Sequence, residues 1–142
     1  MRIRRWRGQA LVELALLSSL LLGLLFAGMQ FGYSFYTYNN LQKAVRDGAR
    51  YAASREYPSG TFATAVTNVV VCGNPGGCSG VNPVVHNLTS SNVIVTMTPA
   101  IGVPSVVTVK INGYTIPGPL GNVTLTNKPS CSFRFIGRYS PG

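Results

Sequence analysis

The chain of 142 residues contains few side chains that could take part in acid–base catalysis or bind a metal ion. It has a single histidine, His86, and three acidic residues, Glu13, Asp47 and Glu56. A paired-carboxylate site, a histidine-based triad or a metal site needs more of these groups than the sequence supplies. We therefore expect no catalytic residue, no cofactor and no metal, and we interpret the protein as one that is not an enzyme. His86 is expected to be a surface or turn residue.

The three cysteines offer a different kind of chemistry, the formation of a disulfide. Cys72 and Cys78 flank five residues that include three glycines and a proline, and such a segment closes easily into a loop. In an oxidising compartment we expect a disulfide between these two residues. Cys131 is then the odd thiol, although the two other pairings also stay open.

Glu13 is the acidic residue whose position needs an explanation, because an apolar segment follows it. No charged residue occurs between Leu14 and Gln42, a run of 29 residues. A helix of that length covers about 43 Å, more than the ~30 Å hydrocarbon core of a bilayer. Aromatic residues, which prefer the membrane interface, gather between Phe31 and Tyr38. The sequence therefore predicts a transmembrane helix over residues 9–38.

A carboxylate in a membrane helix costs up to about 3 kcal/mol at the helix centre and less near the surface. Two explanations of Glu13 are open at this point. Glu13 either lies at the depth of the lipid headgroups close to Arg7, or it is a functional residue whose charge needs a partner that has yet to be named.

The net charge of +9 does not indicate a nucleic-acid partner, because the cations are not arranged as a basic groove. Four arginines precede the apolar segment and four cations follow it between Lys43 and Arg55, so a count alone does not decide the topology. The four arginines at the N-terminus lie closer together in the sequence than the four later cations. The C-terminal part of the chain is weakly charged and contains the cysteines, which suits an oxidising compartment. We therefore place the N-terminus in the cytoplasm and the C-terminal domain outside it.

Helical patterning continues beyond the apolar segment, over residues 39–57, as an extramembrane continuation of the same helix. Small and apolar residues recur there at steps of three and four and form one narrow face: Leu41, Ala44, Val45, Gly48 and Ala52. Glycine costs about 1 kcal/mol relative to alanine inside a helix, which a close backbone approach at Gly48 would offset. A tolerated surface glycine is the alternative. Pro58-Ser59-Gly60 is expected to end the helix and to begin a linker.

Residues 58–142 are predicted to form a small extracytoplasmic β-rich domain. The segment Thr61–Val71 is ambiguous, and we favour a helix to about Asn68. Strand patterns separated by Pro and Gly predict a small antiparallel meander: Asn92–Thr98, Ser105–Ile116, Asn122–Thr126 and Ser130–Ile136. About 80 residues give a marginal core, so we expect the sheet to pack on the helix. The fold class is α+β, a long N-terminal helix packed on a small antiparallel sheet.

The N-terminal residues RRWRGQALVE, Arg4 to Glu13, resemble the leader of type IV pilins, in which a short basic segment ends in Gly and a Glu follows five residues later. The resemblance implies that residues 1–8 are a leader peptide and that a prepilin peptidase cuts between Gly8 and Gln9. Glu13 would then be the fifth residue of the mature chain and a subunit-assembly residue. Its carboxylate could pair with the new N-terminal amine of a neighbouring subunit, so that neither charge is left alone in an apolar bundle.

The combination of GQALVE at residues 8–13 with QFG at 30–32 and DGARYAA at 47–53 is similar to the TadE-like family, the pseudopilins or minor pilins of tight-adherence (Tad/Flp) pilus systems. This resemblance implies a pilin-like fold and a single-pass structural subunit of the bacterial inner membrane, with its C-terminal domain periplasmic or extracellular. The implied partners are the prepilin peptidase, other pilin or pseudopilin subunits and the Tad assembly platform, with no small-molecule substrate. One departure is Ser18-Ser19, where many relatives have a proline about six residues after the Glu.

Three alternatives to a cleaved pseudopilin stay open. The chain could be an assembly-platform or adhesion protein that is anchored in the membrane and never cleaved. It could be a ligand-binding module on a membrane tether, although no cluster of convergent polar or aromatic residues predicts a pocket. The apolar segment could also be an ordinary signal peptide, but it is longer than the usual 7–15 residues and no clear A-x-A site follows it.

Overall fold

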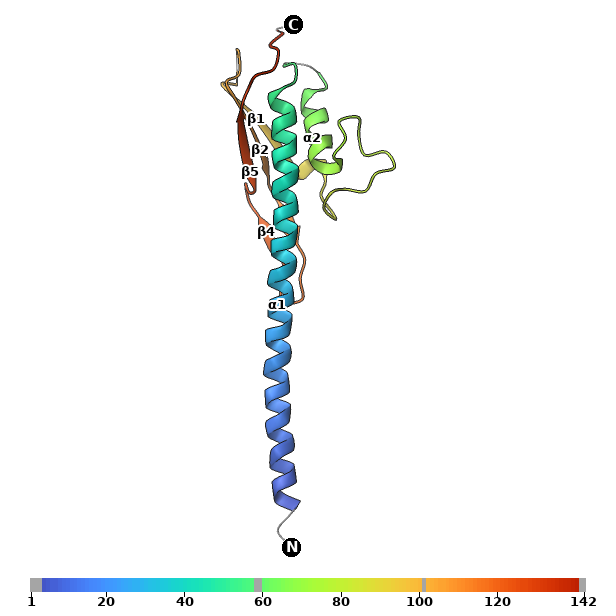
Figure 1. The fold of residues 1–142 in the computed structure, drawn as a ribbon, viewed down its shortest axis with the longest axis vertical. Coiled ribbons are helices and arrows are strands. Elements are labelled where there is room, and N and C mark those ends of the chain that lie inside the picture. Colours follow the sequence, from blue (N-terminus) through green and yellow to red (C-terminus); the bar gives the residue numbers. More distant parts are fainter. Residues whose placement is uncertain (1–3, 58–59, 101, 141–142) are drawn as a thin grey trace.

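The structure, a computed structural model, describes residues 4–57, 60–100 and 102–140, with side chains from residue 8 onward. One long helix runs through the whole molecule, and a second helix and the strands gather around its C-terminal part (Figure 1). This arrangement is α+β, with a long apolar N-terminal helix on a small antiparallel sheet, and it confirms the predicted fold class. The elements are α1 (Arg4–Ala53), α2 (Phe62–Cys72), a 3-10 turn (Ser90–Asn92), β1 (Val93–Thr98), β2 (Val106–Ile111), β3 (Tyr114–Ile116), β4 (Val123–Leu125) and β5 (Ser130–Arg134).

Helix α1 is a single element of 50 residues. No proline occurs before residue 58, so nothing in the sequence of α1 removes a backbone donor. The hydroxyls of Ser18 and Ser19 donate to the carbonyls of Ala15 and Leu16, at 2.9 and 2.8 Å, and thereby stay satisfied within the helix. The helix ends at Ala53, four residues before the expected end at residue 57. Of the expected linker, Pro58 and Ser59 lie outside the described residues.

Helix α2 is longer than the helix expected between Thr61 and Asn68, because it continues through three valines to Cys72. Isolated β-branched residues favour strands, but Val66, Val69 and Val70 are buried in this helix, and tertiary packing overrides local preference. The helix is closed by Gly73, whose φ of 72° is left-handed and whose N–H donates to the carbonyl of Val69 at 2.9 Å.

The strands form two antiparallel sheets rather than the predicted meander. One sheet has the order β1-β2-β5, and the other is the β3–β4 hairpin. The predicted strand Ser105–Ile116 is interrupted after Ile111, because Gly113 has a φ of 70° and turns the chain out of the sheet. Strand β2 then pairs with β5, with Val109 opposite Cys131, and the hairpin leaves the sheet between them.

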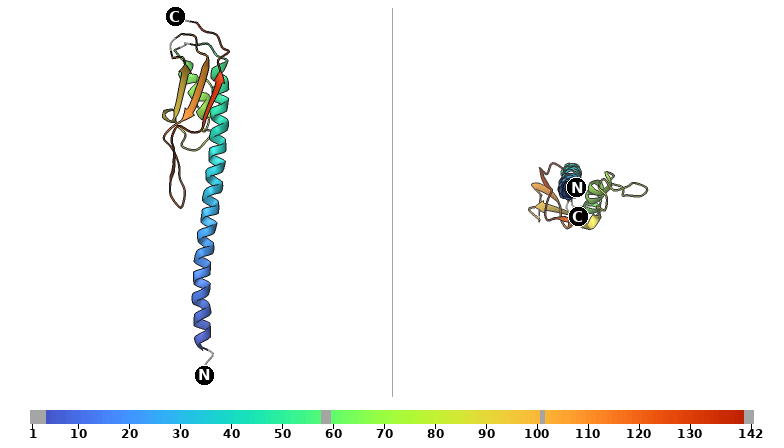
Figure 2. Two further views of the ribbon diagram at one scale, coloured as in Figure 1. Left: turned by 90° about the vertical axis from the view of Figure 1, so that its left-hand side faces the viewer. Right: turned by 90° about the horizontal axis from the view of Figure 1, so that it is seen from below.

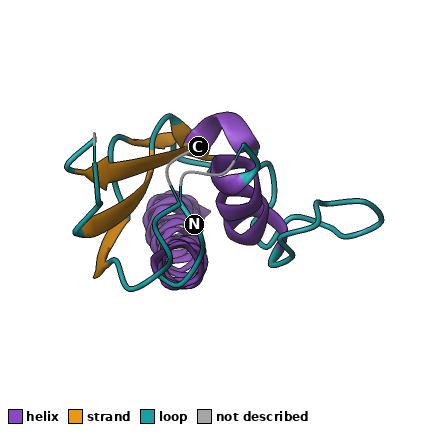
Figure 3. Ribbon diagram, turned by 90° about the horizontal axis from the view of Figure 1, so that it is seen from above, coloured by secondary structure: helices purple, strands orange, loops and turns teal. Residues whose placement is uncertain are grey.

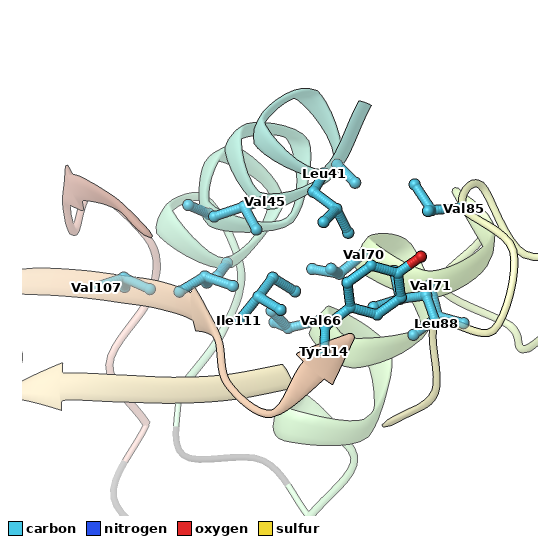
Figure 4. Close-up of a cluster of buried hydrophobic side chains, with 14 of the residues drawn as sticks. Leu41, Val45, Val66, Val70, Val71, Val85, Leu88, Val107, Ile111 and Tyr114 are labelled. Carbon is cyan, nitrogen blue, oxygen red and sulfur yellow. The ribbon is translucent and has the colours of Figure 1, made fainter. Parts of the chain in front are cut away.

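The core lies between α1, α2 and the three-stranded sheet, which surround it as seen along the axis of α1 (Figure 3). The predicted narrow face of α1 supplies one side, and Val66 and Val70 of α2 supply another (Figure 4). The predicted inward face of β2 is confirmed, because Val107, Val109 and Ile111 are fully buried. Gly48 is also buried at this junction and faces Val70, so the interpretation of a close approach is confirmed and that of a surface glycine is wrong.

Candidate functional site

The N-terminal part of α1 extends away from the rest of the protein (Figure 2). Every residue from Gly8 to Phe26 is exposed, and the first residue that other elements bury is Gln30. The leucines of this segment are more than half exposed on all sides of the helix, including Leu14, Leu17 and Leu21. An apolar surface of this extent is unfavourable in water and indicates a membrane or a partner of similar chemistry. Among the described residues, α1 is the one helix that is long and apolar enough to cross a membrane.

The length of the exposed segment matches a bilayer. Residues 8–29 precede the first buried position, and 22 helical residues span about 33 Å, close to the ~30 Å of a hydrocarbon core. Phe31, Phe35 and Tyr36 follow directly and are at least 65% exposed, which is typical of residues at a membrane interface. The geometry of α1 therefore fits a single-pass membrane protein.

Gly8, Gln9 and Glu13 lie at the far end of this segment, on exposed helix. Gln9 and Glu13 are four residues apart, so their side chains share one face of α1. No ion pair joins Glu13 to a cation among the side chains that the structure describes. Arg7, the neighbour considered for Glu13 above, lies outside those side chains.

Cys72 and Cys78 form a disulfide, with their Cα atoms 5.5 Å apart. It closes the base of a loop that projects beside α2 (Figure 1). The loop has internal order as well, since the N–H of Gly76 donates to Oδ1 of Asn74 at 2.9 Å. Cys131 is a free, half-buried thiol on β5. The disulfide therefore holds the loop to the C-terminal end of α2.

The remaining candidate residues do not assemble into a reactive site. His86 is exposed in a turn, as predicted, and its carbonyl accepts a hydrogen bond from the hydroxyl of Tyr114 at 2.8 Å. Burial, with a smaller contribution from the nearby Tyr33, raises the pKa of Tyr114. Across residues 8–57, 60–100 and 102–140, no three His, Cys, Asp or Glu side chains gather closely enough to hold a metal ion.

Gln30 is a structural residue that sequence reasoning missed. It is only 9% exposed, although it lies in an otherwise exposed and apolar part of α1. Its Nε2 donates to the carbonyl of Gly121 at 3.3 Å, and its amide packs against Gly118, so the β3–β4 turn is attached to α1 here. Its Oε1 is buried without a hydrogen-bond partner. A lone amide among apolar residues was the available signal, because such a group needs a partner when buried.

Comparison with known families gives one match. The family model described as TadE-like protein matches residues 8–50, which lie within α1 and contain Gly8, Gln9 and Glu13. This match confirms the predicted resemblance over the helix, and the family is one of structural, pilus-associated proteins. No curated protein and no solved structure matches the chain.

Proposed function

We propose that this chain, whose long helix is TadE-like, is a pseudopilin or minor pilin, a single-pass membrane subunit needed to assemble a Tad (Flp) pilus in adherence. One observation carries the proposal. The family match covers residues 8–50, and within that range residues 8–29 precede the first position of the helix that the domain buries. A helix that is apolar on all sides is stable in lipid or among similar helices. A subunit that moves from a membrane into a fibre needs a helix suited to both.

The proposed processing step is hydrolysis of the peptide bond between Gly8 and Gln9 by a prepilin peptidase. Water adds to the carbonyl of Gly8, which leaves as a carboxylate, and Gln9 becomes the new N-terminus with a free amine. The bond lies inside α1, one turn from its described start at Arg4. Glycine lowers helix stability by about 1 kcal/mol relative to alanine, and helix ends fray, so both effects reduce the free energy needed to expose this bond to a peptidase.

Glu13 is proposed to act in assembly rather than in cleavage. Once Gln9 carries an amine, the amine and the Glu13 carboxylate lie about 6 Å apart along the axis of one helix. A neighbouring subunit displaced by that amount brings its amine level with this carboxylate. Burying either charge alone among apolar helices costs several kcal/mol, whereas a paired amine and carboxylate cancel much of that penalty. The pairing therefore fixes the axial offset between subunits.

The proposed orientation has the N-terminus in the cytoplasm of a bacterium, α1 in the inner membrane, and residues 58–142 on the periplasmic or extracellular side. A Cys72–Cys78 disulfide suits an oxidising compartment of that kind. The proposed partners are the inner membrane, the prepilin peptidase, other pilin or pseudopilin subunits and the Tad assembly platform. The protein itself makes and breaks no bonds in this role.

The test is the intact mass of the protein purified from membranes with and without the prepilin peptidase. Loss of residues 1–8 only when the peptidase is present supports the proposal. An uncut chain in both strains favours the alternative, a permanently anchored assembly-platform or adhesion protein. Cleavage near residue 28 would indicate an ordinary signal peptide.

A matched pair of glycine variants sharpens this experiment. Gly8→Leu should block cleavage, because it alters the residue that donates the carbonyl of the cut bond. Gly23→Leu is the control, because Gly23 lies in the same exposed segment of α1. A Cβ atom added at Gly8 or at Gly23 has no neighbouring atom within 4 Å, so neither position is too crowded for a side chain. If both variants are cut normally, recognition at Gly8 is not what directs processing.

A further inference from the structure

The β3–β4 hairpin lies lower on α1 than any other part of the domain. In Figure 2 its turn extends from the sheet along α1 toward the N-terminus. The turn, residues 117–122, is fixed at that height by the hydrogen bond from Gln30 to Gly121 and by the packing of Gly118 on the Gln30 amide. The hairpin itself is closed by pairing of Tyr114 with Leu125 and of Ile116 with Val123. The contacts of the turn with Gln30 therefore define the position of the hairpin along α1.

The position of the hairpin turn along α1, beside Gln30, coincides with one surface of a bilayer that surrounds the exposed part of the helix. The exposed part of α1 ends at Met29 and covers about 33 Å, so Gln30 lies at the edge of the hydrocarbon core when Gly8 is at the opposite edge. The exposed aromatic residues that begin at Phe31 lie at the depth of the headgroups. The hairpin turn, attached at Gln30, is then in contact with the same layer.

The composition of the hairpin suits that layer. No charged residue occurs from Tyr114 to Asn127. Pro117 and Pro119 have no N–H group, and the N–H of Gly121 donates to the carbonyl of Gly118 at 3.1 Å, so few backbone donors in the turn need water. Leu120 projects at the tip with 62% of its surface exposed, and Val123 is 45% exposed beside it.

Between the hairpin and α1 there is also an apolar cleft of about 360 Å³. Phe31 and Phe35 line it from the helix, and Ile116, Val123 and Leu125 line it from the hairpin. The cleft starts at Gln30, and its other helix-side residues lie one to eight positions further along α1, up to Tyr38, or about 2–12 Å toward the headgroups. The cleft therefore begins at the edge of the hydrocarbon core, where the upper carbons of acyl chains reach its end at Gln30, and it extends from there into the headgroup layer.

We propose that the β3–β4 hairpin is a membrane-surface contact whose partner is phospholipid of the leaflet on the side of the domain, with Leu120 inserted at the interface and upper acyl carbons at the end of the cleft next to Gln30. The inference rests on the proposed membrane span of α1. A second copy of the chain is the competing occupant. Lipid is favoured because the turn is held at the height where the exposed apolar helix ends, and because it carries no charge that could specify a protein partner.

The test places single tryptophans in the full chain, reconstituted at low density in vesicles of phosphatidylethanolamine and phosphatidylglycerol with brominated acyl chains. Trp6→Phe removes the one native tryptophan. Leu120→Trp reports on the hairpin, and Val81→Trp, at an exposed valine three residues after the disulfide loop, is the matched control. Leu22→Trp reports on the middle of the span. Lipids brominated near the headgroup should quench Leu120→Trp and shift its emission to the blue, with no quenching of Val81→Trp.

Each outcome decides a different point. If lipids brominated deep in the chain quench Leu22→Trp but Leu120→Trp behaves like Val81→Trp, the hairpin inference is overturned and the span stands. If Leu22→Trp is not quenched, the span fails and the hairpin inference fails with it. If Leu120→Trp is shielded from aqueous acrylamide without being quenched by lipid bromine, a protein surface covers the tip, and the lipid assignment is wrong.

Discussion

Gly48 on α1 lies against Val70 on α2 with no room for a side chain between them, since a Cβ atom added at Gly48 would overlap Cγ2 of Val70. Val70 is fully buried and cannot turn into solvent. This contact sets the distance at which the two helices cross. It also accounts for a glycine in a helix interior, where alanine would otherwise be favoured by about 1 kcal/mol.

Gly48→Ala should therefore destabilise the domain in spite of its better helix propensity. Overpacking a buried contact costs about 1–3 kcal/mol, which exceeds the gain in propensity. Chemical denaturation of the full chain in detergent, followed by near-ultraviolet circular dichroism, measures the change. In a Val70→Ala background the same substitution should cost less, because the overlapping methyl is gone. An equal cost in both backgrounds would contradict the proposed overlap.

Removal of the Cys72–Cys78 disulfide should lower the free energy of unfolding by about 2 kcal/mol. This is the stabilisation expected when a disulfide closes a short loop and so reduces the conformational entropy of the unfolded chain. The two cysteines are six residues apart, so the loop is short and the effect modest. Thermal melts of Cys72→Ser/Cys78→Ser with and without reductant measure it. Cys131→Ser is the control, because that thiol is free and its variant should keep the full response to reductant.

Tyr114 should make the stability of the domain sensitive to alkaline pH. Its pKa is raised mainly by burial, so the folded state favours the protonated phenol more than the unfolded state does. The associated stability is complete below the unfolded pKa of about 10 and is lost as pH rises through the folded pKa. Tyr114→Phe should remove this component, and at neutral pH it should cost about 1 kcal/mol through the hydrogen bond to His86. Denaturation curves at neutral and alkaline pH for the two proteins decide it.

Glu13→Gln should leave processing at Gly8–Gln9 largely intact and impair incorporation into pili, because the new N-terminal amine loses its charged partner. The measurements are intact mass from membranes and the amount of this subunit in sheared pili. Glu56→Gln is the matched control, because Glu56 is an exposed acid that lies just beyond the end of α1. Normal incorporation of Glu13→Gln would count against the pairing of amine and carboxylate.

The long helix α1 could be predicted from the sequence, because its formation depends on local composition and spacing. The charge-free run after Glu13, the absence of proline before Pro58 and the small-residue face through Gly48 are all visible in the sequence, and α1 follows them. Strand β1 was likewise predicted to within one residue of its start at Val93.

The other features depend on contacts between distant segments. The three valines that end α2 are helical because they are buried in the core, which local β propensity does not reveal. The pairing of β2 with β5 joins Val109 to Cys131 across an intervening hairpin, and no turn signal specifies that pairing. The attachment of Gly121 to Gln30 spans 91 positions and depends on the same long-range placement. Sequence patterns predicted these segments but not their partners.

The continuity of α1 has a mechanical consequence. Because one helix passes from the exposed segment into the core without a proline or a hinge, and the hairpin clamps it at Gln30, the domain is coupled to the helix in both rotation and translation. A shift of α1 along its own axis by the rise of one residue moves the domain by about 1.5 Å in the same direction. Successive residues of the helix are also rotated by about 100° about that axis. Torque or traction applied to the helix at the membrane is therefore delivered to the domain directly, as along a rigid shaft.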